Sequence, residues 1–301
     1  MRIVVTGGHG FLGRYVVMRL QDAGHEIIIP RSASCDLRSQ DNVIKLMRDN
    51  RPEAVIHLAA RVGGIGANAR CPADFIYDNL AMGANVIHQS YVHNVKKFVL
   101  IGTTCSYPKH TPVPFKEADL WNGYPEKTNA PYGLAKRILI EQCAAYRRQH
   151  GFNAVTLIPT NLYGPGDNSN SDTSHVIPAI FKKCLQAIDL CHDHITLWGD
   201  GTPTRDFLFV DDAARAIVTA MDSYNDEQPV NLGTGQETSI SHIASLIIKI
   251  TGFGGRIEWD ISKPNGQPRR CLDTSLAKDK LGFEATTTLE SGLMRYYENL
   301  I

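Results

Sequence analysis

Short apolar runs alternate with longer, helically periodic stretches through the first half of the chain. Apolar residues recur at helical spacing in segments 15–23, 79–93 and 133–150. Between and around these segments lie β-branched runs at 3–5, 26–29, 54–57, 97–101 and 154–158. Strand, helix and strand in series favour parallel pairing through right-handed crossovers. The pattern therefore predicts an α/β fold built on a doubly wound parallel Rossmann sheet.

After Pro165 the pattern changes to shorter elements separated by turns. Residues 166–172 form a polar stretch, and further glycine-containing turn signals follow at 199–201, 233–235 and 252–255. We expect a dinucleotide-binding domain over residues 1–165 and a smaller, irregular α/β substrate domain over 166–301. A segment near 206–234 is expected to return to the first domain.

Charge and composition narrow the function classes. The chain has 31 basic and 31 acidic residues, so no net charge draws it toward nucleic acid or an anionic membrane. After Met1 and Arg2 the first apolar run lasts three residues, too short for a signal peptide. No stretch approaches the roughly 18 apolar residues of a membrane span. We therefore expect no nucleic-acid partner and no membrane partner.

Cysteine usage indicates the redox compartment. The seven cysteines are scattered, odd in number and without a Cys-x-x-Cys pair, as is typical of a reduced, cytoplasmic protein. The run Cys191-His192-Asp193-His194 comes nearest to a metal motif, yet no second ligand cluster accompanies it in the sequence. We expect no metal.

A glycine-rich segment joins the first strand to the first helix. Gly7, Gly10 and Gly13 follow a Gly-x-x-Gly-x-x-Gly spacing, with Phe11 and Leu12 between the last two. Glycines let the backbone turn tightly and approach a pyrophosphate, which the helix N-terminus then faces. The segment predicts a dinucleotide site; a glycine turn without a ligand is the alternative.

The end of the second strand indicates which nicotinamide cofactor binds. In NAD-binding sheets an acidic residue at this point takes the ribose hydroxyls. Here the strand leads into Arg31 and two nearby serines, and no carboxylate follows before Asp36. A guanidinium and hydroxyls suit a 2′-phosphate. The sequence therefore favours NADP(H), unless Arg31 is only a solvated loop cation.

Tyr132 and Lys136 stand four residues apart, so both side chains share one face of the predicted helix. A tyrosine ordinarily has a pKa of about 10, and an adjacent ammonium is expected to lower it. This pair accounts for hydride transfer to or from a carbonyl, with Tyr132 moving the proton. It does not account for Cys105, a thiol shortly after the fourth strand, which indicates proton transfer at carbon as well.

Further segments resemble one enzyme family over nearly the whole chain. They are AARVGGIGAN (59–68), PADFIY (72–77), PTNLYGP (159–165), SHVIPA (174–179), GTPTRDF (201–207) and SKPNGQPR (262–269). Together with the glycine loop and the Tyr-x-x-x-Lys pair, they resemble the GDP-L-fucose synthase family. That family lies within the extended short-chain dehydrogenase/reductase superfamily.

The resemblance implies an enzyme that converts GDP-4-keto-6-deoxy-D-mannose to GDP-L-fucose. Carbons 3 and 5 are inverted, and the ketone at carbon 4 is then reduced by NADPH. Thr103 and Tyr132 would hold the carbonyl oxygen, and Lys136 would also bind the nicotinamide ribose. Inversion removes a proton from one face and returns one to the other, so two groups are needed. The resemblance assigns Cys105 as the base and His175 as the acid.

The residues expected to touch cofactor and substrate come from the glycine loop, the strand ends and the family segments. Cofactor contacts are expected from Gly7, Gly10, Phe11, Leu12, Gly13, Arg31, Asp36, Leu37, Leu58, Ala59, Ala60, Tyr132, Lys136, Pro159, Asn161, Leu162 and His175. Substrate contacts are expected from Asn161, Lys183, Trp198, Arg205 and Lys263. The helices over 79–93 and 132–150 look like those that pair two subunits through a four-helix bundle, which implies a homodimer.

Five residues depart from the family's usual choice. They are Thr103 for Ser, Arg61 for Lys, Ser106 for an apolar residue, Asp206 for Glu and Lys183 for Arg. These departures affect the sugar more than the chemistry. A related GDP-4-keto sugar, of the colitose or heptose type, therefore stays open as the substrate, and the base need not be guanine.

Three other functions stay open at this point. A redox-neutral epimerase with tightly held NAD, such as GDP-mannose 3,5-epimerase, shares the Cys-x-Tyr-Pro arrangement but carries a lysine in place of the segment around His175. A reductase without epimerisation would need neither Cys105 nor His175. A non-enzymatic NADP-sensing regulator would usually lack Tyr132 and Lys136, and both are present.

Overall fold

A parallel sheet forms the centre of the molecule. The computed structural model describes residues 1–168, 175–263 and 265–301, and within these the sheet has six strands in the order β10-β5-β4-β3-β1-β2, all neighbours being parallel. The strands are β1 (Arg2–Thr6), β2 (Glu26–Ile28), β3 (Ala54–His57), β4 (Lys97–Ile101), β5 (Ala154–Pro159) and β10 (Val230–Leu232). Most of the predicted polar loop, Ser174 and Pro264 lie outside the described residues.

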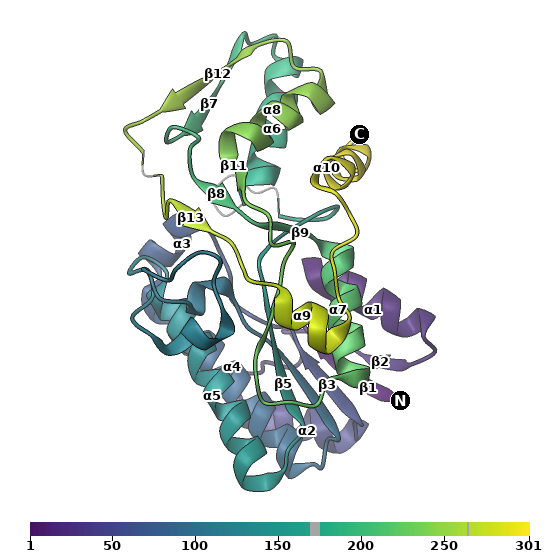
Figure 1. The fold of residues 1–301 in the computed structure, drawn as a ribbon. Coiled ribbons are helices and arrows are strands. Elements are labelled where there is room, and N and C mark those ends of the chain that lie inside the picture. The colour runs from purple at the N-terminus through teal and green to yellow at the C-terminus, as the bar shows by residue number, and fades with distance from the viewer. Residues whose placement is uncertain (169–174, 264) are drawn as a thin grey trace.

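Helices cover both faces of this sheet (Figure 1). One face carries α1 (Phe11–Asp22), α7 (Val210–Ser223) and α9 (Ser275–Leu281), and the other carries α2 (Gln40–Asn50), α4 (Pro72–Val92) and α5 (Ala130–His150). Alternation along β1 explains the two cores: Ile3 and Val5 join the first, and Val4 joins the second. The doubly wound parallel sheet predicted from the sequence is confirmed.

The strand order places a ligand site at one end of the sheet. From β1 the chain moves outward to β2 and then crosses back to β3 on the other side of β1. Connections that leave in opposite directions open a crevice at the carboxyl ends of the strands. The glycine segment follows β1 directly, so it lies at this crevice.

Strand positions follow the apolar runs closely, whereas helix starts do not. The expected strands each lie within one residue of β1 to β5 at either end. Helix α4 begins at Pro72, seven residues before the predicted start, because proline suits the first helical turn. Helix α2 was not predicted: its buried apolar face has only Val43, Leu46 and Met47 among charged residues, although Ser39 caps its start.

The remaining elements form a smaller lobe beyond the carboxyl ends of the strands (Figure 1). It has three short sheets, β11-β8-β13, β12-β7 and β6-β9. Its strands are β6 (Asn161–Tyr163), β7 (His194–Trp198), β8 (Thr204–Arg205), β9 (Phe207–Phe209), β11 (Thr238–Ser239), β12 (Arg256–Asp260) and β13 (Arg269–Arg270). Its helices are α6 (Val176–Asp189), α8 (Ile240–Thr251) and α10 (Leu289–Glu298), which enclose a third apolar core.

Short elements complete the chain. They are α3 (Ile65–Arg70) and the 3-10 turns η1 (Thr104–Ser106) and η2 (Glu117–Trp121). The chain re-enters the large sheet through α7 and β10, which pairs with β5. The division at residue 165 stays a prediction. None of the helices in the described ranges combines the length and the apolarity that crossing a membrane would require.

Candidate active site

A cavity of about 1520 Å³ lies between the carboxyl ends of the sheet strands and the smaller lobe. Its lining includes every residue predicted to contact the cofactor, together with Thr103 and Cys105. Of the residues predicted to contact substrate, Asn161, Trp198 and Arg205 line it, whereas Lys183 and Lys263 do not. The roles of all these residues stay predictions, but the structure brings most of them to one place.

The glycine loop packs closely against neighbouring backbone and lines the cavity at the start of α1. Gly7 has φ +72°, and a Cβ there would lie 2.7 Å from the Ala59 nitrogen; a Cβ on Gly13 would lie 2.1 Å from the Gly7 oxygen. Gly10 precedes α1, whose first turn has no side-chain cap and no acidic residue. The free N–H groups and the positive end of the helix dipole therefore fit an anion such as a pyrophosphate.

The loop after β2 brings two charged residues, Arg31 and Asp36, to the cavity. Arg31 is exposed and lines the cavity. The carboxylate of Asp36 is engaged by Arg38, whose Nη2 donates to Oδ2 at 2.8 Å and whose backbone N–H donates to Oδ1 at 2.9 Å. These hydrogen bonds lower the pKa of Asp36. The carboxylate that could take ribose hydroxyls is thus already occupied.

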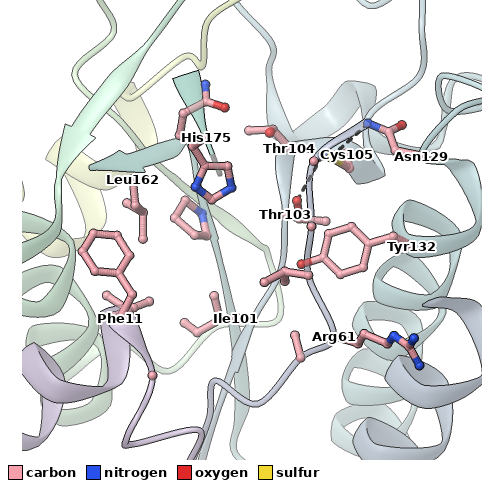
Figure 2. A pocket seen from close by; sticks show the side chains of 18 of the residues that line it. Phe11, Arg61, Ile101, Thr103, Thr104, Cys105, Asn129, Tyr132, Leu162 and His175 are labelled. Carbon is pink, nitrogen blue, oxygen red and sulfur yellow. Dashed lines mark hydrogen bonds between the residues drawn. The ribbon is translucent and has the colours of Figure 1, made fainter. Parts of the chain in front are cut away.

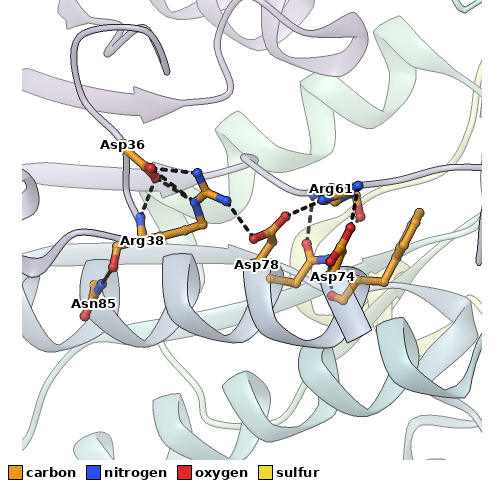
Figure 3. Close-up of polar contacts among 8 residues, drawn as sticks. Asp36, Arg38, Arg61, Asp74, Asp78 and Asn85 are labelled. Atoms are coloured by element: carbon orange, nitrogen blue, oxygen red, sulfur yellow. Dashed lines mark hydrogen bonds and ion pairs between the residues drawn. The ribbon is translucent and has the colours of Figure 1, made fainter. Parts of the chain in front are cut away.

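A chain of ion pairs ties this loop to α4 (Figure 3). Asp78 is buried on α4 and accepts from Arg38 at 3.0 Å and from Arg61 at 2.7 Å. Arg61 also pairs with Asp74 at 3.0 Å. Sequence reasoning did not find Arg38, because only the folded chain places it between Asp36 and Asp78. These ion pairs therefore link the loop after β2 to a helix more than 30 residues further along the chain.

The Tyr132–Lys136 pair lies on α5 against the end of β4. Lys136 is buried, its Nζ donates to the carbonyl of Ile101 at 3.0 Å, and burial lowers its pKa to about 8. Desolvation and the nearby Cys105 raise the pKa of Tyr132, while a hydrogen bond with Thr103 opposes the rise. The expectation that the ammonium lowers this pKa is thus wrong for this structure, because desolvation dominates.

Cys105 lies in the turn η1, held directly against α5. Its backbone N–H donates to Thr103 Oγ1 at 3.2 Å, and a Cβ on Gly133 would lie 2.1 Å from the Cys105 carbonyl oxygen. Two groups reach the thiol: Asn129 Nδ2 donates to Sγ at 3.2 Å, and Arg270 Nη1 lies 3.9 Å from Sγ. The sulfur of Cys105 is thus contacted by an amide donor and lies near a guanidinium group.

Sequence reasoning missed Asn129 and Arg270. Asn129 is the residue just before α5, three positions ahead of Tyr132, and its Oδ1 is buried without a partner in the described part of the chain. Arg270 directly follows the family segment that ends at residue 269. Both residues stand beside segments that the sequence analysis marked. Their contacts with Cys105, which lies 24 residues from Asn129 and 165 residues from Arg270 in the chain, are visible only in the fold.

His175 faces Tyr132 and Lys136, here called the reductase pair, from the other side of the cavity. It is the N-cap residue of α6, and its Nδ1 lies 3.5 Å from Oδ1 of the buried Asp167. This carboxylate raises the pKa of the imidazole. Figure 2 shows Thr103, Cys105 and Tyr132 along one wall and His175 projecting from the opposite side. A thiol and an imidazole 70 residues apart in sequence therefore share one cavity with Tyr132.

Comparison with known proteins identifies the family. Residues 3–233 match the NAD dependent epimerase/dehydratase family. The chain is 42% identical over 99% of its length to a putative GDP-L-fucose synthase 2 of Arabidopsis thaliana, covering 90% of that protein. It is 40% identical over its full length to the GDP-L-fucose synthase of Sinorhizobium fredii, covering 95% of that protein. The chain belongs to the GDP-L-fucose synthase family.

Solved structures show the same relationship. A GDP-6-OMe-4-keto-L-xylo-heptose reductase from C. jejuni superposes with a TM-score of 0.92 at 30% identity, covering 99% of this chain and 96% of the other. A GDP-L-fucose synthetase from Naegleria fowleri bound to NADP superposes with a TM-score of 0.91 at 30% identity, covering 99% and 93%. The GDP-L-fucose synthase family thus has near neighbours that act on different sugars.

In this member of the GDP-L-fucose synthase family the lobe end of the cavity is aromatic and basic. The Trp198 side chain is 65% exposed and lines the cavity. Burial and the neighbouring Arg270 lower the pKa of Arg205 to about 10. Lys263 lies outside the lining with Nζ 5.8 Å from the Trp198 ring centroid, and Lys183 donates to the Thr196 carbonyl at 2.6 Å. An indole and guanidinium groups suit a nucleobase and a diphosphate.

Proposed function

We propose that this protein converts GDP-4-keto-6-deoxy-D-mannose to GDP-L-fucose, by inverting carbons 3 and 5 and then reducing the ketone at carbon 4 with NADPH. The observation that carries the proposal is the presence of Cys105 and His175 in the same cavity as Tyr132 and Lys136. A simple reductase needs only Tyr132 and Lys136. The names of the curated relatives, GDP-L-fucose synthases from plants and bacteria, support the same assignment.

The inversion steps use the ketone to acidify its two neighbouring carbons. Cys105, as the thiolate, takes the proton from carbon 3 or 5, and the electron pair moves onto the carbon 4 oxygen as an enolate. Hydrogen bonds from Thr103 and Tyr132 stabilise that oxygen, a type of contribution worth about 3–4 kcal/mol per donor. Protonated His175 then returns a proton to the opposite face, which inverts the carbon and restores the ketone.

The reduction step uses the same oxygen. NADPH, when bound, would supply the hydride for carbon 4. Tyr132 gives its phenolic proton to the oxygen, and its raised pKa keeps that proton in place until negative charge develops on the substrate. Lys136, fixed to the Ile101 carbonyl, holds its positive charge beside the site where the phenolate forms.

The chain's own residues fit NADP(H) better than NAD(H). The uncapped start of α1 and the glycine cradle suit the pyrophosphate. Arg31 is available for a 2′-phosphate, while the nearest carboxylate, Asp36, is engaged by Arg38. Similar proteins support this choice, because a GDP-L-fucose synthetase and a GDP-mannoheptose C4 reductase have been solved with NADP.

Isotope exchange tests the proposal in one experiment. The protein is incubated with GDP-4-keto-6-deoxy-D-mannose in deuterated water, with and without NADPH, and the sugar is examined by NMR and mass spectrometry. We expect deuterium at carbons 3 and 5 without NADPH, and GDP-L-fucose with matching NADPH oxidation when the cofactor is added. Reduction without any exchange would leave a plain reductase, and exchange without net NADPH use would indicate a redox-neutral epimerase.

A related GDP-4-keto sugar is the second candidate substrate. Its support is the structural similarity to a heptose reductase and to a GDP-D-glycero-L-gluco-heptose synthase from Campylobacter jejuni, together with 33% identity to a GDP-L-colitose synthase of Yersinia pseudotuberculosis. Parallel assays with the 6-deoxyhexose, 3,6-dideoxyhexose and heptose substrates separate these options. The highest kcat/KM identifies the sugar.

We also propose a cytoplasmic homodimer. Helices α4 and α5 lie side by side, and exposed apolar side chains such as Tyr77, Val92 and Ile138 lie on them. Two such pairs would form a four-helix bundle and cover these side chains. The described cysteines are all free thiols, as suits a reducing compartment. Light scattering after size exclusion tests the dimer; a monomeric mass would overturn it.

A further inference from the structure

Asp167 is a buried carboxylate next to the candidate acid. It follows a turn in which Gly164 (φ +146°) and Gly166 (φ +84°) adopt conformations that side chains disfavour. Its side chain is 2% exposed, and Oδ1 accepts the Asn168 backbone N–H at 2.7 Å. Its Oδ2 is buried and has no hydrogen-bond partner within the described residues. A buried carboxylate is costly unless it is paired.

Of the described groups around Asp167, His175 is the one positioned to form an ion pair with its carboxylate. The nearby guanidinium of Arg14 donates to the Gly166 carbonyl instead. Burial and the charge of Asp167 raise the pKa of Tyr296, on α10, to about 12. His175 presents Nδ1 to Oδ1 at 3.5 Å. Among the described groups, Asp167 is the charged neighbour that acts on the imidazole.

We propose that Asp167 is a positioning residue, which holds the His175 imidazole by Nδ1 and leaves Nε2 directed at the reacting carbons. This inference rests on the proposed function, in which His175 returns the proton. The carboxylate selects the neutral tautomer with hydrogen on Nδ1 and stabilises the imidazolium, as an aspartate does behind a catalytic histidine elsewhere. The His175 side chain is 54% exposed, and Asp167 is its charged partner among the described residues.

The sign of the electrostatic effect agrees with an acid role. Asp167 raises the pKa of His175 above its ordinary value. A protonated donor is lost as the pH rises through its pKa, so a raised value keeps the acid form at higher pH. Removing the negative charge should therefore move the high-pH limit of proton return to lower pH.

Histidine NMR tests the proposal without any substrate. The full-length protein is labelled with ¹⁵N and ¹³C histidine, and the His175 signals are assigned from their absence in His175→Gln. We expect the wild-type neutral ring to carry hydrogen on Nδ1 and to titrate above pH 6.5. In Asp167→Asn the midpoint should fall by about one pH unit or more. Asp167→Glu should restore most of the wild-type value.

A matched control uses the other Asp–His pair with the same atoms. Asp193 Oδ1 lies 2.8 Å from His194 Nδ1 on the exposed surface, away from the cavity. Asp193→Asn should leave the titration of His175 unaltered. The pH profile of deuterium exchange at carbons 3 and 5 should shift downward in Asp167→Asn alone, while reduction of an already inverted 4-ketone stays within about two-fold.

Two results would overturn the proposal. One is a wild-type His175 that carries hydrogen on Nε2 or titrates at or below the ordinary value, which needs no variant and so holds even if Asp167→Asn does not fold. The other is a folded Asp167→Asn in which the His175 midpoint and the exchange profile are those of the wild type. If the wild type shows no exchange at all, the proposed function fails, and the NMR titration still decides the role of Asp167.

Discussion

The two walls of the cavity hold their reactive groups in different ways. On the wall formed by β4 and α5, here called the sheet wall, Lys136 is buried and donates a hydrogen bond to the backbone of β4. The helix that carries it packs on the core. On the lobe wall, His175 is half-exposed at the start of α6 and, among the described residues, has Asp167 as its charged partner. Lys136 is therefore held by burial and a backbone contact, whereas the described contact that holds the candidate acid is an exposed ion pair.

This difference separates what each wall contributes. In the proposed mechanism, Tyr132 and Lys136 serve the reduction, so variants on the sheet wall should act mainly on that step. Proton return by His175 would depend on Asp167 and on where the lobe places the sugar ring. Cys105 stands between these cases: its turn packs on Gly133, but its thiol is reached by Asn129 and Arg270 from outside the sheet. Variants on each wall should therefore separate the two activities.

The largest effect is expected for Tyr132→Phe, which removes the proton donor from the sheet wall. We expect C4 reduction to fall roughly 10²–10⁴-fold, because the proposed mechanism takes the proton for the oxygen from the Tyr132 phenol. NADPH oxidation at 340 nm measures it. Tyr124→Phe, at an exposed tyrosine outside the cavity, should keep wild-type activity. Equal activity in both variants would remove Tyr132 from the mechanism.

Cys105→Ser should separate the two activities instead of abolishing both. A hydroxyl is a far weaker base than a thiolate, so deuterium exchange should fall by at least about 100-fold. Reduction of an already inverted GDP-4-keto sugar should continue within a few-fold. Cys191→Ser, at an exposed thiol, is the matched control. Retained exchange in Cys105→Ser would show that another group is the base.

Gly13→Ala tests whether the glycine loop must keep its conformation for the protein to bind NADPH. The new Cβ would lie 2.1 Å from the Gly7 oxygen, so the loop must shift. We expect a loss of about 1–3 kcal/mol in stability and at least a ten-fold weaker NADPH affinity, measured by calorimetry and fluorescence titration. Gly254→Ala, where nothing lies within 4 Å, is the control. An unchanged affinity would mean that the loop is not the pyrophosphate site.

The same contrast explains how much the sequence could predict. Tyr132 and Lys136 share a helix face, so spacing alone brings them together. The glycine loop follows a strand whose position the apolar run marks. These are local patterns on regular elements, and for the same reason the strand positions and the parallel sheet were predicted correctly.

The lobe wall could not be predicted in this way. Cys105 and His175 were paired only through a family resemblance, since no periodicity connects residues 70 apart. Arg270 reaches Cys105 from β13, and Asp167 contacts His175, which lies eight residues later in the chain; neither contact is visible in the local spacing of the sequence. The pKa of Tyr132 was predicted with the wrong sign, because desolvation is a property of the folded cavity and not of a helix face.

Arg31→Ala addresses the cofactor choice with a smaller expected effect. Loss of one charge-assisted contact to a 2′-phosphate should raise the KM for NADPH roughly ten-fold and leave the KM for NADH unaltered. Steady-state kinetics with both cofactors measures the split. Arg48→Ala, an exposed arginine of α2 paired with Asp49, is the control. A parallel rise for both cofactors would contradict a phosphate-specific role.

The smallest expected effect comes from Arg38→Ala, which acts on the same choice indirectly. Arg38 occupies the Asp36 carboxylate and is itself anchored by Asp78 (Figure 3). Without it, Asp36 becomes available to the ribose hydroxyls of NADH, and its charge acts unscreened on a 2′-phosphate. Exposed ion pairs are individually weak, so the preference for NADPH over NADH should fall only about two- to five-fold.

The direction of that change distinguishes two roles for Arg38. If Arg38 contacted the phosphate itself, its loss would raise the KM for NADPH as strongly as the loss of Arg31 and would not improve NADH. If it acts by covering Asp36, the KM for NADH should fall, and Asp36→Asn added to Arg38→Ala should cancel that gain. A double variant that keeps the improved NADH affinity would show that the carboxylate is not what Arg38 controls.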